Sequence, residues 1–288
     1  MKRNHLSRRS VISLTGNERT SFLNGLITND VQALSQNGTA WAAMLNAQGR
    51  IQTLFFLWKT EEALLLDLPE TETDSLLKTL RRFRLRADVH MERMDATILT
   101  GAPETPRPDG ALIHAADPRH PALGWRAIIP GSPANDEAVQ QREADALLAR
   151  RLQTGIPGDE DIVPGQTLVL EANMDHLHGV SWTKGCYLGQ EVTARTHYRG
   201  LIKKRLLPVR STDGQPLPDE GTVTLDGQEV GELRSVGELR SHAGQHGLAL
   251  LHRRAWNTSG LQLDDHPITL DWPDWLPRDT EQTQEKDS

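Results

Sequence analysis

Cysteine is almost absent from this sequence, which has one, Cys186, in 288 residues. A single cysteine excludes an intramolecular disulfide framework, and it excludes a metal site built from several cysteines of one chain. Any metal cluster held through this residue therefore needs ligands from another molecule. Because a thiol that has to stay reduced fits the cytosol, we expect a cytoplasmic protein.

Long apolar runs and an excess of positive charge are also missing. No stretch approaches the roughly 18 uninterrupted apolar residues of a membrane-spanning helix. The net charge of −7 argues against general nucleic-acid binding through a basic surface. Hydrophobic residues make up 37% and charged residues 25%, which is typical of a soluble globular chain. We therefore expect a monomer that binds neither a membrane nor nucleic acid directly.

The N-terminal segment MKRNHLSRRS is basic, but it passes at once into an apparent strand and has no apolar signal core. We interpret it as a short surface arm, with a transit peptide as the alternative. The length of the chain allows two or three compact units, because single cores stop growing at roughly 250–300 residues.

The most informative stretch lies at 184–195 and reads KGCYLGQEVTAR. Gly185 and Gly189 permit backbone angles that other residues resist, so the chain can turn sharply here and display Cys186. The alternation of apolar and polar residues at 179–183 predicts a short strand that leads into this turn. The residues after Gly189 are too few to decide between a helix and a second strand.

A lone cysteine is most often a small buried residue without chemistry. Here Lys184 and Arg195 bring positive charge close to Cys186, which favours the thiolate over the thiol, whose ordinary pKa is about 8.5. We therefore predict an exposed Cys186 that is reactive together with Lys184. Gln190 and Glu191 are expected to hold the loop by hydrogen bonds.

Strands and helices alternate in the N-terminal half, as in a β-α-β unit with antiparallel additions. The expected strands are Val11–Leu14, Trp41–Leu45, Ile51–Trp58, Ala63–Asp67, a strand near Val89, Thr97–Leu99 and Trp125–Ile129. Expected helix starts are the N-cap Asn17, a capping box of Thr71 and Asp74, and Ser132 followed by Pro133. The arginines at 81–86 are interpreted as a solvated basic face at a helix end.

Short strands separated by Asp-Gly turns follow from about Pro208, at 222–225, 229–236, 247–251 and 268–270. This pattern predicts a separate small β barrel or sandwich. The six residues VGELRS occur twice in succession from Val230, which we interpret as a duplication that lengthens a strand or adds a bulge. The charged tail at 279–288 lacks apolar residues and is expected to be disordered.

Two other groups invite a functional interpretation. His176 and His178, with Asp175 and His197, suggest a metal site, but polar surface is the simpler explanation because no third ligand follows at a recognisable spacing. The dense basic group at 195–210 suits an anion such as a phosphate or a carboxylate, and a solvated strand face explains it equally well.

The cysteine stretch, followed by THYRGLIKKRLLPV, resembles the signature of the YgfZ/GcvT-like folate-binding family. The resemblance is closest to the branch that includes the mitochondrial and alphaproteobacterial iron–sulfur assembly factors. Two further pieces fit in the same order: LTGNERTSFLNGLITNDVQAL with AAMLNAQGRI, and EVGELRSVGELRS with GLALLHRR. Together these pieces cover most of the chain.

The resemblance implies an α+β, GcvT-like multi-domain fold with a discontinuous folate-binding core. Its first domain is expected at 1–48 and 132–207, a ferredoxin-like inserted unit at 49–131, and a C-terminal β-barrel domain at 208–278. The implied ligand is tetrahydrofolate in a central hole of this fold. The implied folate contacts are Asn29, Asp30, Asn46, Glu171, Gln190, Glu191 and Arg195.

The implied function is that of a folate-binding accessory factor for the assembly or repair of [4Fe–4S] clusters in iron–sulfur enzymes, including tRNA-modifying radical enzymes. Cys186 is implied as a ligand of a transient iron–sulfur cluster shared with an A-type iron–sulfur carrier protein. The alternative is a tetrahydrofolate-dependent one-carbon transferase of the aminomethyl type. Those transferases resemble GxIxDD after the first hairpin, whereas Gln52 and Thr53 follow Ile51 here. The missing acid favours an accessory factor over an enzyme in its own right.

Overall fold

The computed structural model describes residues 8–131, 137–238 and 245–278. The expected helix start at Ser132 and Pro133, the end of the VGELRS duplication and the tail at 279–288 lie outside these residues.

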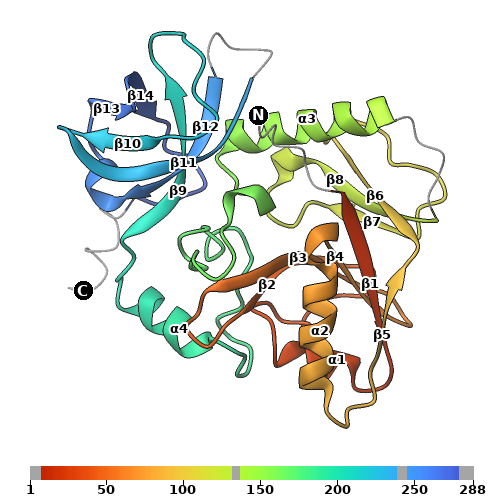
Figure 1. The fold of residues 1–288 in the computed structure, drawn as a ribbon. Coiled ribbons are helices and arrows are strands. Elements are labelled where there is room, and N and C mark those ends of the chain that lie inside the picture. Colours follow the sequence, from red (N-terminus) through yellow and green to blue (C-terminus); the bar gives the residue numbers. More distant parts are fainter. Residues whose placement is uncertain (1–7, 132–136, 239–244, 279–288) are drawn as a thin grey trace.

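Five antiparallel strands form the N-terminal sheet, in the order β2-β3-β4-β1-β5 (Figure 1). They are β1 (Arg9–Thr15), β2 (Thr39–Leu45), β3 (Ile51–Lys59), β4 (Leu64–Pro69) and β5 (His90–Met94). The strands predicted over this region are confirmed. Alternation along β1 places Ile12 and Leu14 in one core and Val11 in the core on the opposite face of the sheet.

Two helices accompany this sheet: α1 (Arg19–Asn24) and α2 (Thr73–Arg84), the second following a 3₁₀ turn at Glu70–Glu72. α2 packs on the sheet through Leu76, Leu77 and Leu80, which are buried. Both predicted caps are wrong, because neither helix has a side-chain cap. The Asn17 side chain donates to the carboxylate of Asp88 instead, 3.0 Å away, and the 3₁₀ turn leads the backbone directly into α2.

A second sheet has the order β6-β8-β7, with β6 (Ala96–Gly101), β7 (Ile113–Ala116) and β8 (Trp125–Pro130). Sequence reasoning missed β7, whose four residues include only one that is buried. Buried charges join the two sheets: Asp67 on β4 pairs with Arg9 on β1 and with Arg126 on β8. The Arg126 guanidinium also lies 3.7 Å from the centre of the Phe56 ring.

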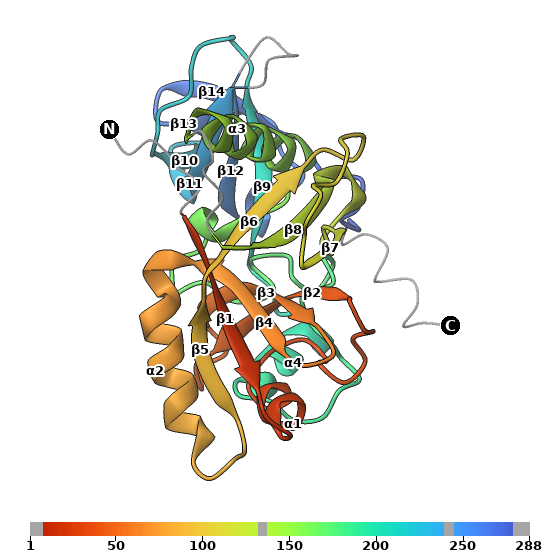
Figure 2. The same cartoon turned by 90° about the vertical axis from the view of Figure 1, so that its right-hand side faces the viewer.

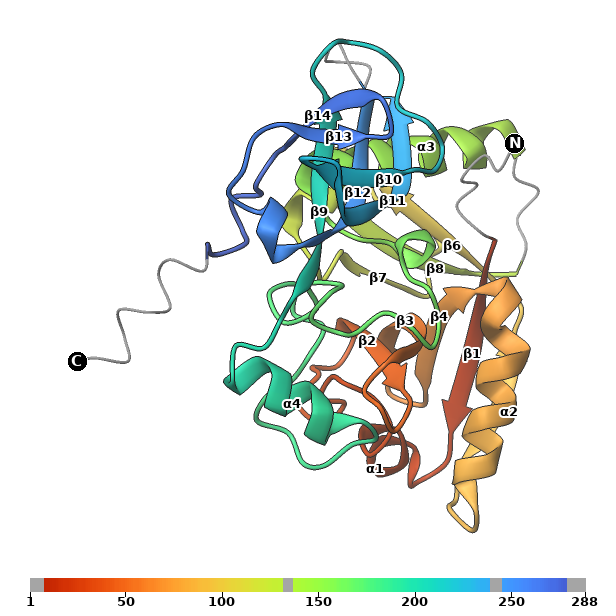
Figure 3. The same ribbon diagram turned by 60° about the vertical axis from the view of Figure 1, so that its left-hand side comes forward.

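The C-terminal strands close into a barrel with the order β10-β11-β12-β9-β14-β13, and α3 (Glu137–Thr154) lies beside it (Figure 3). The strands are β9 (Lys204–Ser211), β10 (Thr222–Leu225), β11 (Gln228–Glu238), β12 (Gln245–His252), β13 (Leu261–Leu263) and β14 (His266–Leu270). The predicted strands of this region are confirmed, and the three-residue β13 was missed.

The VGELRS duplication has the expected effect where the structure describes it. β11 is 11 residues long, and its register against β12 shifts between Leu233 and Ser235. Gly237, in the second copy, lies against α3 so closely that a Cβ there would be 2.8 Å from a methyl of Leu152. The added residues therefore extend the contact between the barrel and α3.

The mixed helix and strand content and the C-terminal barrel confirm the expected fold class. The division into domains stays a prediction. β9 begins at Lys204, ahead of the expected boundary at 208, and the β2–β3 hairpin crosses the expected boundary at 49. In the described part of the chain, no helix has the length and apolar character needed to span a membrane.

Candidate functional site

Cys186 lies on an exposed loop directly before α4 (Gln190–Tyr198). The structure thus assigns the residues after Gly189 to a helix, which the sequence left open. The strand expected at 179–183 is wrong. The backbone N–H groups of Gly179 and Ser181 donate to Met174 and Thr28 in separate loops, so no neighbouring strand continues the pairing.

Lys184 anchors this loop from below. Its Nζ donates to the backbone oxygens of Asn24, Ile27 and Asn29, at 2.6, 2.9 and 2.7 Å. Burial lowers the pKa of Lys184 to about 8, while the nearby Asp30 carboxylate acts in the opposite direction. These carbonyls use all three N–H bonds of the ammonium group. Lys184 therefore holds the loop against the segment after α1, and its donors do not point at the Cys186 thiol.

The two glycines of the loop have different roles. Gly189 has a φ of +81°, and a Cβ there would lie 2.6 Å from the backbone oxygen of Asn46 and 2.9 Å from the Leu45 Cβ. Gly185 has open space around the corresponding position. Only Gly189 is required by the structure, because it lets the start of α4 touch the turn between β2 and β3.

The far end of α4 is fixed by aromatic stacking. The His197 ring stacks on Trp182 with centroids 3.9 Å apart and an interplanar angle of 15°. Tyr198 meets both rings edge-on, at 5.9 and 5.1 Å. Burial lowers the pKa of His197, so the ring favours its neutral form in this stack. α4 is thus braced on both sides of the loop that displays Cys186.

Gln190, Glu191 and Arg195 lie on α4, close in sequence to Cys186. Glu191 and Arg195 are exposed. The expected loop-holding bonds of Gln190 and Glu191 are not observed, since neither side chain has a hydrogen bond within the described residues; backbone contacts do this work, such as Gln190 N–H to Tyr187 oxygen at 3.2 Å.

Asn29 and Asp30 shape the segment that Lys184 binds. The Asn29 amide donates to the backbone oxygens of Trp41 and His178, at 2.9 and 2.7 Å. One Asp30 carboxylate oxygen accepts from two backbone N–H groups, those of Gln32 and Ala33. These bonds stabilise turns, which is the simpler of the two roles that their positions in the sequence suggested.

Asn46 and Glu171 flank the same hairpin turn. The Asn46 side-chain oxygen accepts from the backbone N–H groups of Gln48 and Arg50, both at 3.0 Å. One Glu171 carboxylate oxygen accepts from Leu168 N–H at 2.8 Å, and burial raises the pKa of Glu171. The structure therefore brings Asn46 to the start of α4, while Glu171 follows the segment bridged to Arg50.

Two groups suggested by the sequence are divided by the fold. Asp175 receives two hydrogen bonds from buried Arg205, at 3.1 and 2.9 Å, so its carboxylate is engaged. In the chain segments that the structure describes, no three residues are grouped as a metal site requires. The basic group at 195–210 separates into exposed residues on α4, buried Arg205, and Arg210, which pairs with Asp271.

Sequence reasoning missed Tyr187, the neighbour of Cys186. Its ring is buried, and its hydroxyl has no hydrogen-bond partner within the described residues. Burial raises the pKa of Tyr187 to about 12. The Lys184 Nζ lies 5.1 Å from the ring centre. Its place in the cysteine stretch was the available signal, but burial of a tyrosine next to an exposed cysteine requires the tertiary structure.

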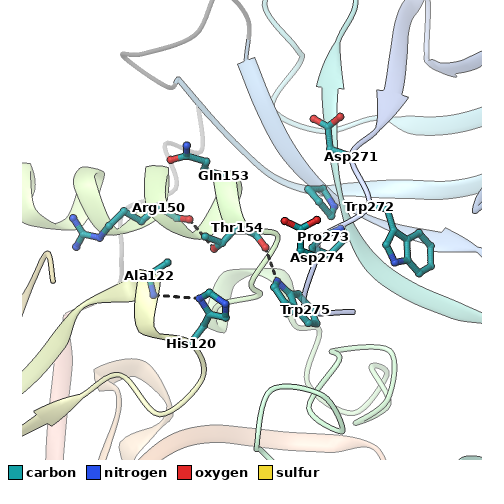
Figure 4. Close-up of a pocket in the computed structure, with 11 residues that line it drawn as sticks. His120, Ala122, Arg150, Gln153, Thr154, Asp271, Trp272, Pro273, Asp274 and Trp275 are labelled. Atoms are coloured by element: carbon teal, nitrogen blue, oxygen red, sulfur yellow. Dashed lines mark hydrogen bonds between the residues drawn. The ribbon is translucent and has the colours of Figure 1, made fainter. Parts of the chain in front are cut away.

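A cavity of about 450 Å³ lies elsewhere, between the end of α3 and the segment after β14 (Figure 4). Trp275, His120 and Thr154 are among its lining residues, and the Trp275 indole donates to the Thr154 backbone oxygen at 2.7 Å. None of the expected folate contacts lines this cavity.

Comparison with known proteins gives consistent results. The family model described as the CAF17 C-terminal beta-barrel domain matches residues 203–278. The chain is 33% identical to the human "Iron-sulfur cluster assembly factor IBA57, mitochondrial", over 94% of this chain and 84% of that protein. It is 32% identical to the IBA57 homologue of Coccidioides immitis, over 85% of this chain and 70% of that protein.

The solved structure of glycine cleavage system aminomethyltransferase T from Bartonella henselae has the same fold. The TM-score is 0.74 at 14% sequence identity, with 94% of this chain and 85% of that chain covered. At this identity the likeness shows the fold alone.

The expected cytoplasmic location is wrong. The relatives from human, mouse and Coccidioides immitis are all named as mitochondrial proteins, which overturns an expectation that rested only on the presence of a free thiol.

Proposed function

The chain belongs to the family of IBA57 iron–sulfur cluster assembly factors, and from this premise we propose that it assists the assembly or repair of [4Fe–4S] clusters in iron–sulfur enzymes. The proposed clients include radical enzymes that modify tRNA. The proposed partner is an A-type iron–sulfur carrier protein, with which the chain transiently shares a cluster.

The observation that supports this proposal best is the display of the chain's one thiol. Cys186 is exposed on a loop that is held by Lys184 on one side and by the start of α4 on the other. An iron–sulfur cluster normally takes four protein ligands. A single cysteine therefore supplies one ligand, and a partner supplies the rest.

The surface of α4 offers a place for that partner. Val192, Tyr198 and Leu201 are exposed to 39%, 64% and 51%, and exposed Arg195 and Arg199 lie among them. We call this set the α4 surface. Exposed apolar residues with charges around them are typical of protein interfaces, and the arginines favour a partner with an acidic rim.

We further propose that the chain binds tetrahydrofolate. The supporting groups are the hydrogen-bonding atoms left over after the local turns are formed: the second carboxylate oxygen of Glu171 and the buried hydroxyl of Tyr187. A pterin ring presents N–H donors, which suit a carboxylate acceptor. Arg195 is proposed to attract the carboxylates of the folate tail.

Anaerobic mixing with an A-type carrier, iron and sulfide tests the cluster proposal. The wild-type chain should form a hetero-complex with the visible absorption of an iron–sulfur cluster, and the Cys186→Ser variant should not. The Gly185→Ala variant is the matched control, because open space surrounds that position and the thiol is retained. An undiminished cluster band on the Cys186→Ser complex would refute the role of the thiol.

Fluorescence titration tests the folate proposal, with the seven tryptophans as reporters. Polyglutamated tetrahydrofolate should bind more tightly than the monoglutamate, and added salt should reduce the difference. Arg195→Gln should remove the preference. Equal affinities for the two forms at low salt would contradict the proposed role of Arg195.

A further inference from the structure

The C-terminal end of α2 carries an unusual combination of exposed side chains at 81–86, which we call the α2 tip. The sequence of the tip is Arg81-Arg82-Phe83-Arg84-Leu85-Arg86, and all six residues are exposed. Leu85 is 85% exposed, the largest value among the exposed large hydrophobic residues of the described chain, and Phe83 is 39% exposed.

The charge of the α2 tip opposes that of the chain. Four arginines and no acidic residue occur in six positions, although the whole chain has a net charge of −7. Arg81, Arg82 and Arg86 have no ion-pair partner among the described residues, and Arg84 makes one long contact, 3.5 Å, to the Val89 backbone oxygen. Most of this positive charge is therefore available to a partner.

Helix electrostatics explain only part of the pattern. Cations in the last turn of a helix are stabilised by its carbonyl end, which accounts for Arg81, Arg82 and Arg84. Arg86 lies beyond the helix, and Leu85 has a φ of +48°, a left-handed conformation that is unfavourable for a leucine. An exposed leucine held in such a conformation is a reason to consider a function for the tip.

The position of the α2 tip favours a flat partner. Figures 2 and 3 show the turn between α2 and β5 at one extremity of the molecule, beyond α1 and α4. A projecting point offers little area to another protein, because a stable interface typically buries about 800 Å² on each side. A bilayer surface needs no matching pocket, and two apolar side chains among cations suit its interface.

We propose that the α2 tip binds the surface of an anionic lipid bilayer. Phe83 and Leu85 enter the boundary between headgroups and acyl chains, and the surrounding arginines pair with lipid phosphates. The absence of a spanning helix does not bear on such peripheral contact. The acidic groups of the rest of the chain do not prevent it, because charges more than about 8 Å away are largely screened at physiological ionic strength.

Vesicle flotation with the full chain tests this proposal. The chain should float with vesicles of phosphatidylcholine mixed with phosphatidylglycerol, and not with pure phosphatidylcholine, and high salt should release it. Arg81→Gln combined with Arg82→Gln should weaken binding about tenfold, since each arginine near an anionic surface contributes about 1 kcal/mol. The matched control is Arg195→Gln with Arg199→Gln on the α4 surface, which should bind as wild type does.

A fluorescent label tests insertion separately from charge. Because Cys186 is the only cysteine, Leu85→Cys in a Cys186→Ser background accepts one polarity-sensitive dye. Its emission should shift to the blue on addition of the anionic vesicles, and a dye at Leu201→Cys in the same background should not respond. Two results would overturn the proposal: equal loss of vesicle binding by the α4 control, or retention of the chain on soluble polyglutamate with no binding to vesicles. The second result would indicate an acidic protein partner.

Discussion

The α4 surface and the α2 tip have similar exposed chemistry but differ in their support. Each combines arginines with exposed apolar side chains in a chain of net charge −7. α4 is packed on the β2–β3 turn through Gly189 and is stacked on Trp182 through His197. The α2 tip projects from its helix with Leu85 in a left-handed conformation. The same residue types therefore form a fixed platform in one place and a projecting point in the other.

This difference separates the proposed roles. A ligand that completes a cluster has to be held in one geometry, and the supports of α4 provide this for the neighbouring Cys186. A bilayer contact requires exposure and charge, which the α2 tip provides without a fixed partner geometry. Four changes test the contrast, and they follow in order of expected effect.

Gly189→Ala should have the largest effect. A left-handed conformation is unfavourable for alanine, and the added Cβ would lie 2.6 Å from the Asn46 backbone oxygen. We expect a loss of about 3 kcal/mol in the free energy of unfolding, measured by urea denaturation, together with loss of cluster sharing. Gly185→Ala should change neither. Wild-type stability in Gly189→Ala would show that the start of α4 is not fixed.

Lys184→Met should cost about 2 kcal/mol, because three backbone oxygens lose a charged donor. The Cys186 loop should then exchange its amide hydrogens faster, as measured by hydrogen–deuterium exchange. Arg82→Met at the α2 tip is the matched control and should leave stability within about 0.5 kcal/mol of wild type. Equal effects of the two variants would mean that Lys184 is not an anchor.

Charge reversal should distinguish the two surfaces by their partners. Arg195→Glu with Arg199→Glu should weaken binding of an A-type carrier about tenfold and increase its dependence on salt, while vesicle binding stays intact. Arg81→Glu with Arg82→Glu should give the opposite pair of results. Calorimetric titration and flotation measure the two affinities, and a variant that loses both would contradict separate surfaces.

Glu72→Gln should have the smallest effect and one that depends on pH. Burial, with a contribution from Asp159, raises the pKa of Glu72 from 4.5 to about 7. Between these values the folded chain binds more protons than the unfolded chain, so wild-type stability falls as pH rises. The variant removes this fall, and its advantage over wild type should grow from pH 5 to pH 7 and then stay constant. Thermal melts at several pH values measure it; an advantage that is constant across the range would contradict the raised pKa.

Local pattern was sufficient for most of the fold. Strands such as 41–45 and 222–225 follow from alternation and from turn residues, because these signals act over a few positions. The same reasoning failed where a distant contact decides. The segment at 179–183 alternates like a strand, yet its backbone donors reach Met174 and Thr28. The predicted caps failed for this reason too, since Asn17 binds Asp88 across the fold.

The sequence by itself determined that one thiol is available and that it lies between glycines in a basic stretch, because composition and order do not depend on folding. The tertiary structure decided what surrounds that thiol. Only folding brings the carbonyls of 24–29 to the Lys184 ammonium, and only folding places Asn46 where Gly189 alone fits. Contacts between residues more than a hundred positions apart depend on how sheets and loops pack, and no local pattern encodes them.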